Sequence, residues 1–234
     1  MDESPTLSEV VQQGRERLFP SLTNPNWLVL RERRRIFEGW LAQLPTRELE
    51  VLDIGGRIQP YRALIANRLR RYVAIDLRVT PLVNVVARGE QLPVGDASFD
   101  LVICTQVMEY VAQPPQVFAE VHRVLKPGGA LLLSVPGACP VDAGHECWRF
   151  LPAGLRYQLA GFTRVEVMAE GSSVTGLFRT VNTCLDIFSR YPAVRFVYRH
   201  SFCPMWNLAG ALAEKLSGGR NQQFVVNYSV LAEK

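Results

Sequence analysis

The spacing of apolar residues indicates helices in the first part of the chain. After the arginine-rich stretch 31–35, apolar side chains recur every three or four positions, at Ile36, Phe37, Trp40, Leu41 and Leu44. This period predicts an amphipathic helix. We interpret the arginines of stretch 31–35 as its solvent-exposed face. Residues 1–47 are therefore expected to form a helical extension.

From Glu50 onward, short apolar runs alternate with helical patterns. Runs that predict strands are VLDI, YVAID, VNVV, DLVIC and ALLLSV, followed by TRVEVM (163–168) and FVVNYSVLA (224–232); YRALIANRLR and VFAEVHRVL predict helices between them. Strands that alternate with helices are typical of a parallel sheet covered on both faces. About 55 residues separate the last two runs, far more than a loop of about 2 to 6 residues needs, and we expect helices there.

Composition narrows the class of protein. The chain has 234 residues, of which 48% are hydrophobic and 21% charged, which fits one globular domain with additions. The net charge of +4 is too small and scattered to indicate nucleic-acid binding. Five cysteines, an odd number without a CxxC pair, argue against a disulfide framework or a metal site, and we predict a reducing, cytoplasmic location. The acidic N-terminus and the lack of a long apolar run predict neither a signal peptide nor a membrane span.

The segment LDIGGRIQPY (52–61) follows the first predicted strand of the sheet. Gly55 and Gly56 allow a tight turn there. Asp53 would repel the pyrophosphate of a dinucleotide, whereas S-adenosylmethionine presents an ammonium and a sulfonium, so Asp53 suits that ligand better. Asp76 ends the next strand, where a carboxylate can accept hydrogen bonds from both ribose hydroxyls. The alternative for Asp76 is an aspartate that only ends the strand in a turn.

Taken together, residues 50–170 resemble a class I S-adenosylmethionine-dependent methyltransferase of the small-molecule type. The matching pieces occur in the order of that family: VLDIGG, YVAIDL, GEQLPVGDASFDLVICTQVMEYV, EVHRVLKPGGALLLSVP and WRFLPAGLRYQLAGF. The resemblance implies a doubly wound α/β fold with a mostly parallel, seven-stranded, Rossmann-like sheet. We expect a single domain, with an N-terminal extension (1–47), a cofactor-binding core (48–170), a helical cap insert (171–221) and a last strand (222–234).

The resemblance also implies site residues. Cofactor contacts are expected from Asp53, Gly55, Gly56, Tyr61, Asp76, Leu77, Glu90, Gln91, Leu92, Cys104, Thr105 and Gln106. Asp76 would bind the ribose, Leu77 would lie against adenine, and residues 104–106 would line the methionine end. We give Cys104 no catalytic role, because a thiol at a buried strand end is usually part of the core. No metal is expected.

The chain departs from the family pattern at three positions. Arg57 and Gln59 replace glycines of the common loop, and Arg88 stands where an aspartate is frequent. A bulky side chain can block the approach of backbone to ligand. However, the proline and tyrosine that follow resemble a variant loop of the family, and we favour a working loop. The alternative is a non-catalytic binding module that keeps the fold and has lost the cofactor.

The segment HECWRFLPAGL (145–155) resembles a pattern of methyltransferases that accompany bacterial surface-glycan biosynthesis. His145 could act as general base on an acceptor hydroxyl, because an imidazole titrates near neutral pH. Equally, His145 could only fix the loop by hydrogen bonds. The expected reaction is methyl transfer to an oxygen or nitrogen of a small molecule, with a sugar of a surface glycan or a lipid-linked sugar as the suggested acceptor.

The insert 171–221 mixes aromatic residues with arginines, among them Arg179 and Arg199. Such a cap could cover an acceptor and bind a sugar or lipid phosphate. It could also lie peripherally on an anionic membrane, or serve only as packing. Methylation of nucleic acid is disfavoured, because CTQVMEY stands where a motif such as NPPY would bind a flipped base.

Overall fold

The computed structural model describes residues 5–44, 48–141, 144–186 and 191–234. One sheet has seven strands in the order β3-β2-β1-β4-β5-β7-β6, with β7 antiparallel to both of its neighbours. The strands are β1 (Leu49–Ile54), β2 (Leu69–Asp76), β3 (Val85–Val86), β4 (Phe99–Thr105), β5 (Leu125–Pro136), β6 (Arg164–Ala169) and β7 (Asn227–Glu233). The predicted doubly wound, mostly parallel sheet is confirmed.

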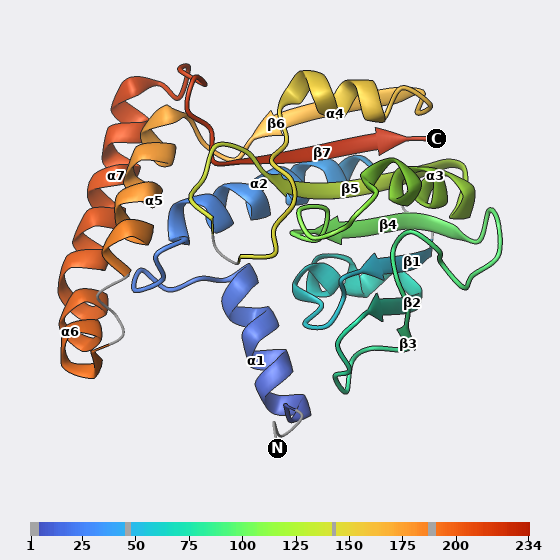
Figure 1. The fold of residues 1–234 in the computed structure, drawn as a ribbon, viewed down its shortest axis with the longest axis horizontal. Coiled ribbons are helices and arrows are strands. Elements are labelled where there is room, and N and C mark those ends of the chain that lie inside the picture. Colours follow the sequence, from blue (N-terminus) through green and yellow to red (C-terminus); the bar gives the residue numbers. More distant parts are fainter. Residues whose placement is uncertain (1–4, 45–47, 142–143, 187–190) are drawn as a thin grey trace.

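Helices cover both faces of the sheet (Figure 1). They are α1 (Leu7–Leu18), α2 (Trp27–Gln43), the 3-10 helix η1 (Pro60–Arg68), α3 (Pro114–Val124), α4 (Pro152–Gln158), α5 (Ser173–Asp186), α6 (Pro192–Val197), the π-helical turn η3 (Tyr198–Phe202) and α7 (Cys203–Ser217). The predicted helix YRALIANRLR ends at Arg68, because Leu69 already pairs with Leu49 as the first residue of β2.

Alternation along β1 divides the core into two layers. Leu52 and Ile54 pack with the apolar side of α3, whereas Leu49 and Val51 pack with α2 on the opposite face. This follows from the period of two in a strand, which turns successive side chains to opposite faces. Both faces of β1 are therefore buried, as parallel strands require.

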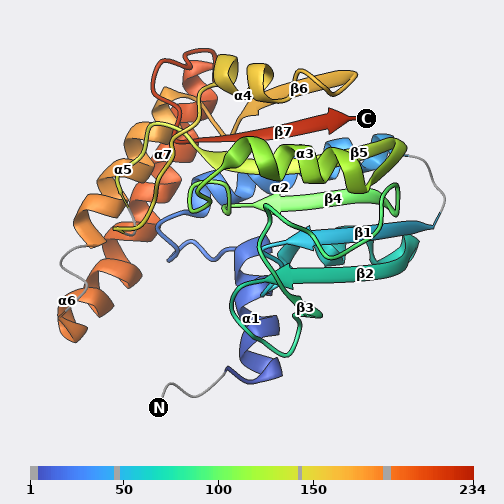
Figure 2. The same cartoon turned by 45° about the vertical axis from the view of Figure 1, so that its right-hand side comes forward.

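The carboxyl ends of the parallel strands point toward α1, α5 and α7 (Figures 1 and 2). Helix α1 begins with a capping box, in which the Thr6 hydroxyl accepts from the Glu9 amide and the Glu9 carboxylate accepts from the Thr6 amide. Its Gly14 lies against the carbonyl of Ile58, with no room for a side chain. Helix α1 therefore packs on the loop that follows β1.

Candidate functional site

The turn after β1 lies at the point where the strand order reverses. β1 pairs with β2 on one side and β4 on the other, which is where open α/β sheets bind ligands. The amides of Gly55 and Gly56 donate to the carbonyl of Ile75, at 2.7 and 3.2 Å. Gly55 has φ +79°, and a Cβ there would collide with the side chain of Val107. A residue other than glycine would therefore displace the loop after β4 as well as strain the turn.

Gln59 takes the left-handed conformation in which the family has a glycine. Its backbone has φ 43° and ψ 51°, and its side chain is held on both sides. Nε2 donates to the carbonyl of Leu82 (2.7 Å), and Oε1 accepts from Arg62 (3.0 Å). Arg57 extends into solvent, while its carbonyl accepts from the hydroxyl of Thr80. The Gln59 side chain thus fixes the loop to the β2–β3 connection, whereas the Arg57 contact to that connection is made by the backbone.

Asp53 is buried beneath this turn. Its carboxylate accepts from the Tyr72 hydroxyl at 2.5 Å and lies against Gly56. Burial raises the pKa of Asp53 to about 7, the Tyr72 hydrogen bond opposes this, and nearby Asp76 adds to it. A cationic ligand would favour the charged form. Direct contact between Asp53 and a ligand remains a prediction.

Asp76 is more open than Asp53. One oxygen accepts from the Arg78 amide at 2.8 Å, and the side chain is partly exposed at the end of β2. Leu77 and Val79 beside it are more than half exposed. A carboxylate beside an uncovered apolar surface has the chemistry that a ribose and an adenine ring need, so these residues fit the cofactor implied by the sequence.

The remaining predicted cofactor residues differ in accessibility. Leu92 and Cys104 are core residues, and burial raises the pKa of the Cys104 thiol far above its usual range. Any contact of these two with a ligand would use the backbone. Gln91 is exposed, and Glu90 accepts from the Ala112 amide at 3.3 Å. The segment 90–92 is thereby held against the loop after β4.

The loop after β4 has an unusual backbone. Gln106 has φ +56°, and its amide donates to the carbonyl of Ser134 in β5. Side chains other than glycine rarely adopt this conformation, and such residues concentrate at functional sites. Thr105 precedes it, partly exposed at the strand end. The backbone of this loop is thus turned out of the sheet at the place where the sequence predicts the methionine end of the cofactor.

Glu109, in the same loop, has an unusual carboxyl group. It is only 2% exposed, and Oε2 has no hydrogen-bond partner among the described residues. Burial raises its pKa to about 7, Arg33 and Arg17 lower it, and Glu146 raises it. A buried carboxyl group whose pKa is raised to about 7 is suited to general acid–base chemistry.

His145 lies beside this loop. The amides of Cys147 and Trp148 donate to the carbonyl of Glu109, at 2.6 and 3.3 Å, and the Trp148 indole donates to the carbonyl of Val111. The His145 ring is exposed and lies 5.2 Å from that of Tyr110, centroid to centroid. His145 is therefore near Glu109 in the fold, and its catalytic role remains a prediction.

Arg33 shows that the interpretation of stretch 31–35 was wrong at one position. Arg33 is 2% exposed and forms a bidentate pair with Glu170, at 2.9 to 3.0 Å. Glu170 also accepts from the hydroxyls of Ser134 and Ser229. Arginine is tolerated in the core only when paired in this way. The other arginines of the stretch are partly or fully exposed, as expected.

Unpartnered polar atoms surround Arg33. Its Nη1 and the Tyr61 hydroxyl are buried without a hydrogen bond in the described part of the chain. Arg17 of α1 lies close enough that Arg33, together with burial, lowers its pKa. Buried polar groups are normally satisfied, so the cluster of Arg17, Arg33, Tyr61 and Glu109 is suited to a polar ligand.

A second polar region lies between the connection of α1 to α2 and the helices after β6. It is a hollow of about 460 Å³ lined by Arg179, Thr183, Asp186 and Arg199 together with Glu16, Ser21 and residues 23–26. Arg179 donates to Asn26 at 3.0 Å, and Arg199 lies 3.8 Å from Asp186. Both arginines that the sequence singled out in the insert therefore face the N-terminal segment.

The described ranges contain no group of three or more His, Cys, Asp or Glu side chains placed to hold a metal. The five cysteines are free thiols. Among the same residues, no helix is long and apolar enough to cross a membrane.

The known sequences that this chain resembles include methyltransferases. Residues 52–133 match the family model described as a methyltransferase domain. A protein of Mycolicibacterium smegmatis, named as an S-adenosylmethionine-dependent methyltransferase, is 29% identical over 141 residues, or 56% of this chain and 54% of its own length. A malonyl-acyl-carrier-protein O-methyltransferase of Marinomonas sp. is 32% identical over 129 residues, 48% of each chain. The chain spans about half the length of the curated relatives it matches.

Solved structures agree on the fold. An S-adenosylmethionine-dependent methyltransferase of Archaeoglobus fulgidus has a TM-score of 0.56 at 13% identity and covers 95% of this chain and 99% of its own. The cyclase SpnF has a TM-score of 0.54 at 17% identity and covers 99% and 97%. Because the same fold also carries a cyclase, the fold alone does not assign the reaction. Residues 52–133, however, match a methyltransferase domain, and the fold is also that of an S-adenosylmethionine-dependent methyltransferase of known structure.

Proposed function

We propose that the chain transfers the methyl group of S-adenosylmethionine to an oxygen or nitrogen of a small acceptor. The observation that carries this proposal is the glycine turn after β1 beside the partly exposed Asp76 and Leu77. When bound, the cofactor supplies a methyl group on a cationic sulfur. Asp76 would accept from the ribose hydroxyls, and Leu77 would lie against adenine. The backbone of residues 104–106 would line the methionine end.

Glu109 is the group we propose to accept the proton that the acceptor loses. Its carboxyl is buried, has one free oxygen and titrates near pH 7. His145 is the second candidate, since its segment is hydrogen-bonded to the same loop. Much of the rate of such a reaction comes from holding the acceptor in line, so a base need contribute only part of it.

An acceptor with an anionic group suits the basic side chains around the site. Arg17 and Arg33 approach Glu109, and Arg179 and Arg199 line the polar hollow beside the connection of α1 to α2. Arginine binds carboxylates and phosphates through paired hydrogen bonds. The Marinomonas relative is named for methylation of a malonyl group, which carries a carboxylate. Segment 145–155 suggests a sugar phosphate or a lipid-linked sugar of a surface glycan. These are also acceptors with an anionic group.

Label transfer tests this proposal. The protein is incubated with methyl-labelled S-adenosylmethionine and pairs of acceptors, each sugar phosphate beside the same sugar without phosphate. Mass spectrometry should find label on an acceptor together with an equal amount of S-adenosylhomocysteine, and the phosphorylated member of each pair should react faster. Labelling of neutral sugars alone would contradict the anionic acceptor while leaving methyl transfer in place.

The alternative is a binding module that has lost the cofactor. It rests on Arg57 and Gln59 at glycine positions and on the presence of the same fold in a cyclase. Against it, the Gln59 side chain is bonded to Leu82 and Arg62, and the Arg57 side chain lies in solvent. Neither residue needs to occupy the ligand side of the turn.

A further inference from the structure

The apolar side chains of α7 point away from the rest of the molecule. The inward positions Cys203, Asn207 and Gly210 are buried. The outward stripe consists of residues more than half exposed: Met205, Leu208, Leu212 and Leu216. A helix that covers a core normally presents its apolar stripe inward. In α7 the arrangement is reversed, and the stripe needs another partner.

The stripe continues through the preceding segment. Between α6 and α7 the backbone stays helical through η3, so Pro192–Ser217 forms one rod of about 39 Å. Exposed side chains follow one another at intervals of three or four positions along this rod, at Val194, Val197, Ser201 and Met205. Apolar side chains, interrupted by Ser201, thus run along the exposed face of α6 and α7. In Figure 1 these two helices lie at the edge of the molecule, away from α4.

Positive charge is concentrated in the same segment. The chain has 26 basic and 22 acidic residues; six of the basic and two of the acidic ones lie in 171–221, which leaves twenty of each elsewhere. Arg195, Lys215 and Arg220 are exposed in this segment, whereas Arg199 lies beside Asp186. The insert therefore carries the entire net charge of the chain.

The two acidic residues of the insert are engaged elsewhere. Glu214 accepts from Ser172 and Thr175, which turns its carboxylate toward the start of α5. Asp186 faces Arg199. Lys215, by contrast, is exposed between Leu212 and Leu216 in sequence and flanks the stripe.

We propose that the apolar stripe of Pro192–Ser217 docks on an anionic lipid bilayer. An apolar face flanked by lysine and arginine is the composition of helices that lie in a membrane interface, and each basic side chain adds attraction to anionic headgroups. A symmetric pair of chains would instead place two basic surfaces against each other. This proposal is independent of methyl transfer. It would bring the carboxyl ends of the sheet close to acceptors held at a membrane.

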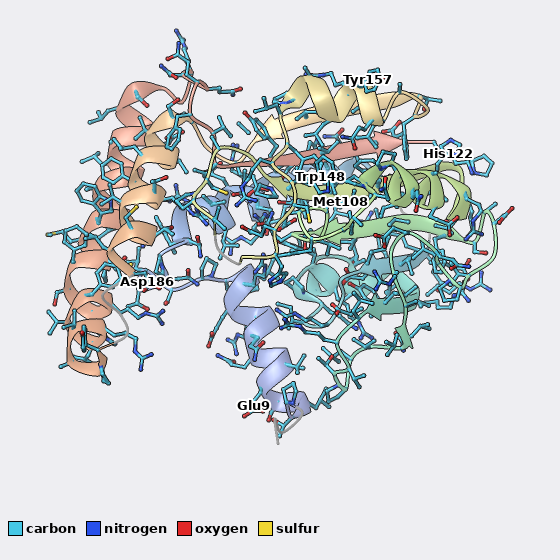
Figure 3. The ribbon with its side chains drawn as sticks, viewed as in Figure 1. Glu9, Met108, His122, Trp148, Tyr157 and Asp186 are labelled. Atoms are coloured by element: carbon cyan, nitrogen blue, oxygen red, sulfur yellow. The ribbon has the colours of Figure 1, made fainter. Side chains whose placement is uncertain are left out.

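Vesicle sedimentation tests the proposal on the whole chain. Vesicles of phosphatidylcholine alone are compared with vesicles that also contain phosphatidylglycerol. The unmodified chain should bind the anionic vesicles at least about tenfold more tightly, and added salt should weaken this binding. Leu208→Glu/Leu212→Glu should reduce it at least about tenfold. The control is Tyr157→Glu in α4, an aromatic residue even more exposed than Leu208 and Leu212 and away from α6 and α7 (Figure 3), which should bind as the unmodified chain does.

Three results would overturn the proposal. They are equal binding to both kinds of vesicle, unchanged binding of the double variant, and a dimer in analytical ultracentrifugation that the double variant dissociates. Circular dichroism verifies that each variant is folded. If the leucine variant unfolds, Lys215→Glu decides the question. Replacing this exposed lysine should weaken binding to the anionic vesicles and leave binding to the phosphatidylcholine vesicles unchanged.

Discussion

Replacing Glu109 by glutamine is expected to lower kcat about 100-fold with little change in cofactor affinity. The amide keeps the shape and the hydrogen-bonding capacity of the side chain but cannot take a proton, and general bases typically contribute about 10² to 10⁴ in rate. Cofactor binding should hold because Asp76, on β2, is unaltered. Steady-state kinetics and calorimetry with S-adenosylhomocysteine, on the same preparation, provide the two measurements.

The pH dependence of the reaction rate is a second test of Glu109 as the base. Because burial raises the pKa of Glu109 to about 7, the carboxyl is protonated below that pH and cannot act as a base. The rate should therefore rise as pH increases through about 7, and Glu109→Gln should lose this step. His145→Asn is the matched comparison from the adjoining segment. If His145→Asn removes the step and Glu109→Gln retains it, histidine is the base and our assignment of Glu109 is wrong.

Asp76→Ala is expected to weaken S-adenosylhomocysteine binding by about tenfold or more. The substitution leaves two ribose hydroxyls without their charged acceptor, and a lost charge-assisted hydrogen bond costs about 1 to 3 kcal/mol. The fold should tolerate it, because the side chain is partly exposed and its one hydrogen bond in the described structure is to the Arg78 amide. Calorimetry measures the affinity. Arg78→Ala, which keeps that amide, is the control.

An Asp76→Ala variant that binds the product as well as the unmodified chain does would remove Asp76 from the ribose site. Thermal unfolding distinguishes this outcome from general damage. Lower affinity together with a large fall in Tm would show that Asp76 acts on the fold instead of the ligand.

The strands of the sheet could be predicted because residues adjacent in the sequence specify each of them. Each buried parallel strand is a short apolar run, and the helices between them show their own period. The turn that we assign to the cofactor was recognisable for the same reason, since its glycines and aspartates lie beside the strand ends in sequence. The observed ends of helices and strands differ from the predicted ones where strand pairing determines them. One example is Leu69, which pairs with Leu49 in the sheet.

Arg33 could not be interpreted from its neighbours. In the sequence it stands among solvent-exposed arginines, and its partner Glu170 is 137 positions away. The same holds for Glu109, whose pKa is raised by burial and by Glu146 and lowered by Arg33 and Arg17, all of them distant from it in sequence. The reversed α7 was hidden for a different reason: a helical period shows that one face is apolar but not which way that face points.

Binding of S-adenosylhomocysteine to the unmodified chain tests the central claim most directly, because both the methyl transfer and the assigned residues require it. Isothermal titration calorimetry should give a dissociation constant in the micromolar range, which corresponds to a binding free energy on the order of −8 kcal/mol. No detectable heat at high ligand concentration, with a folded protein by circular dichroism, would contradict the account and favour the binding module that has lost its cofactor.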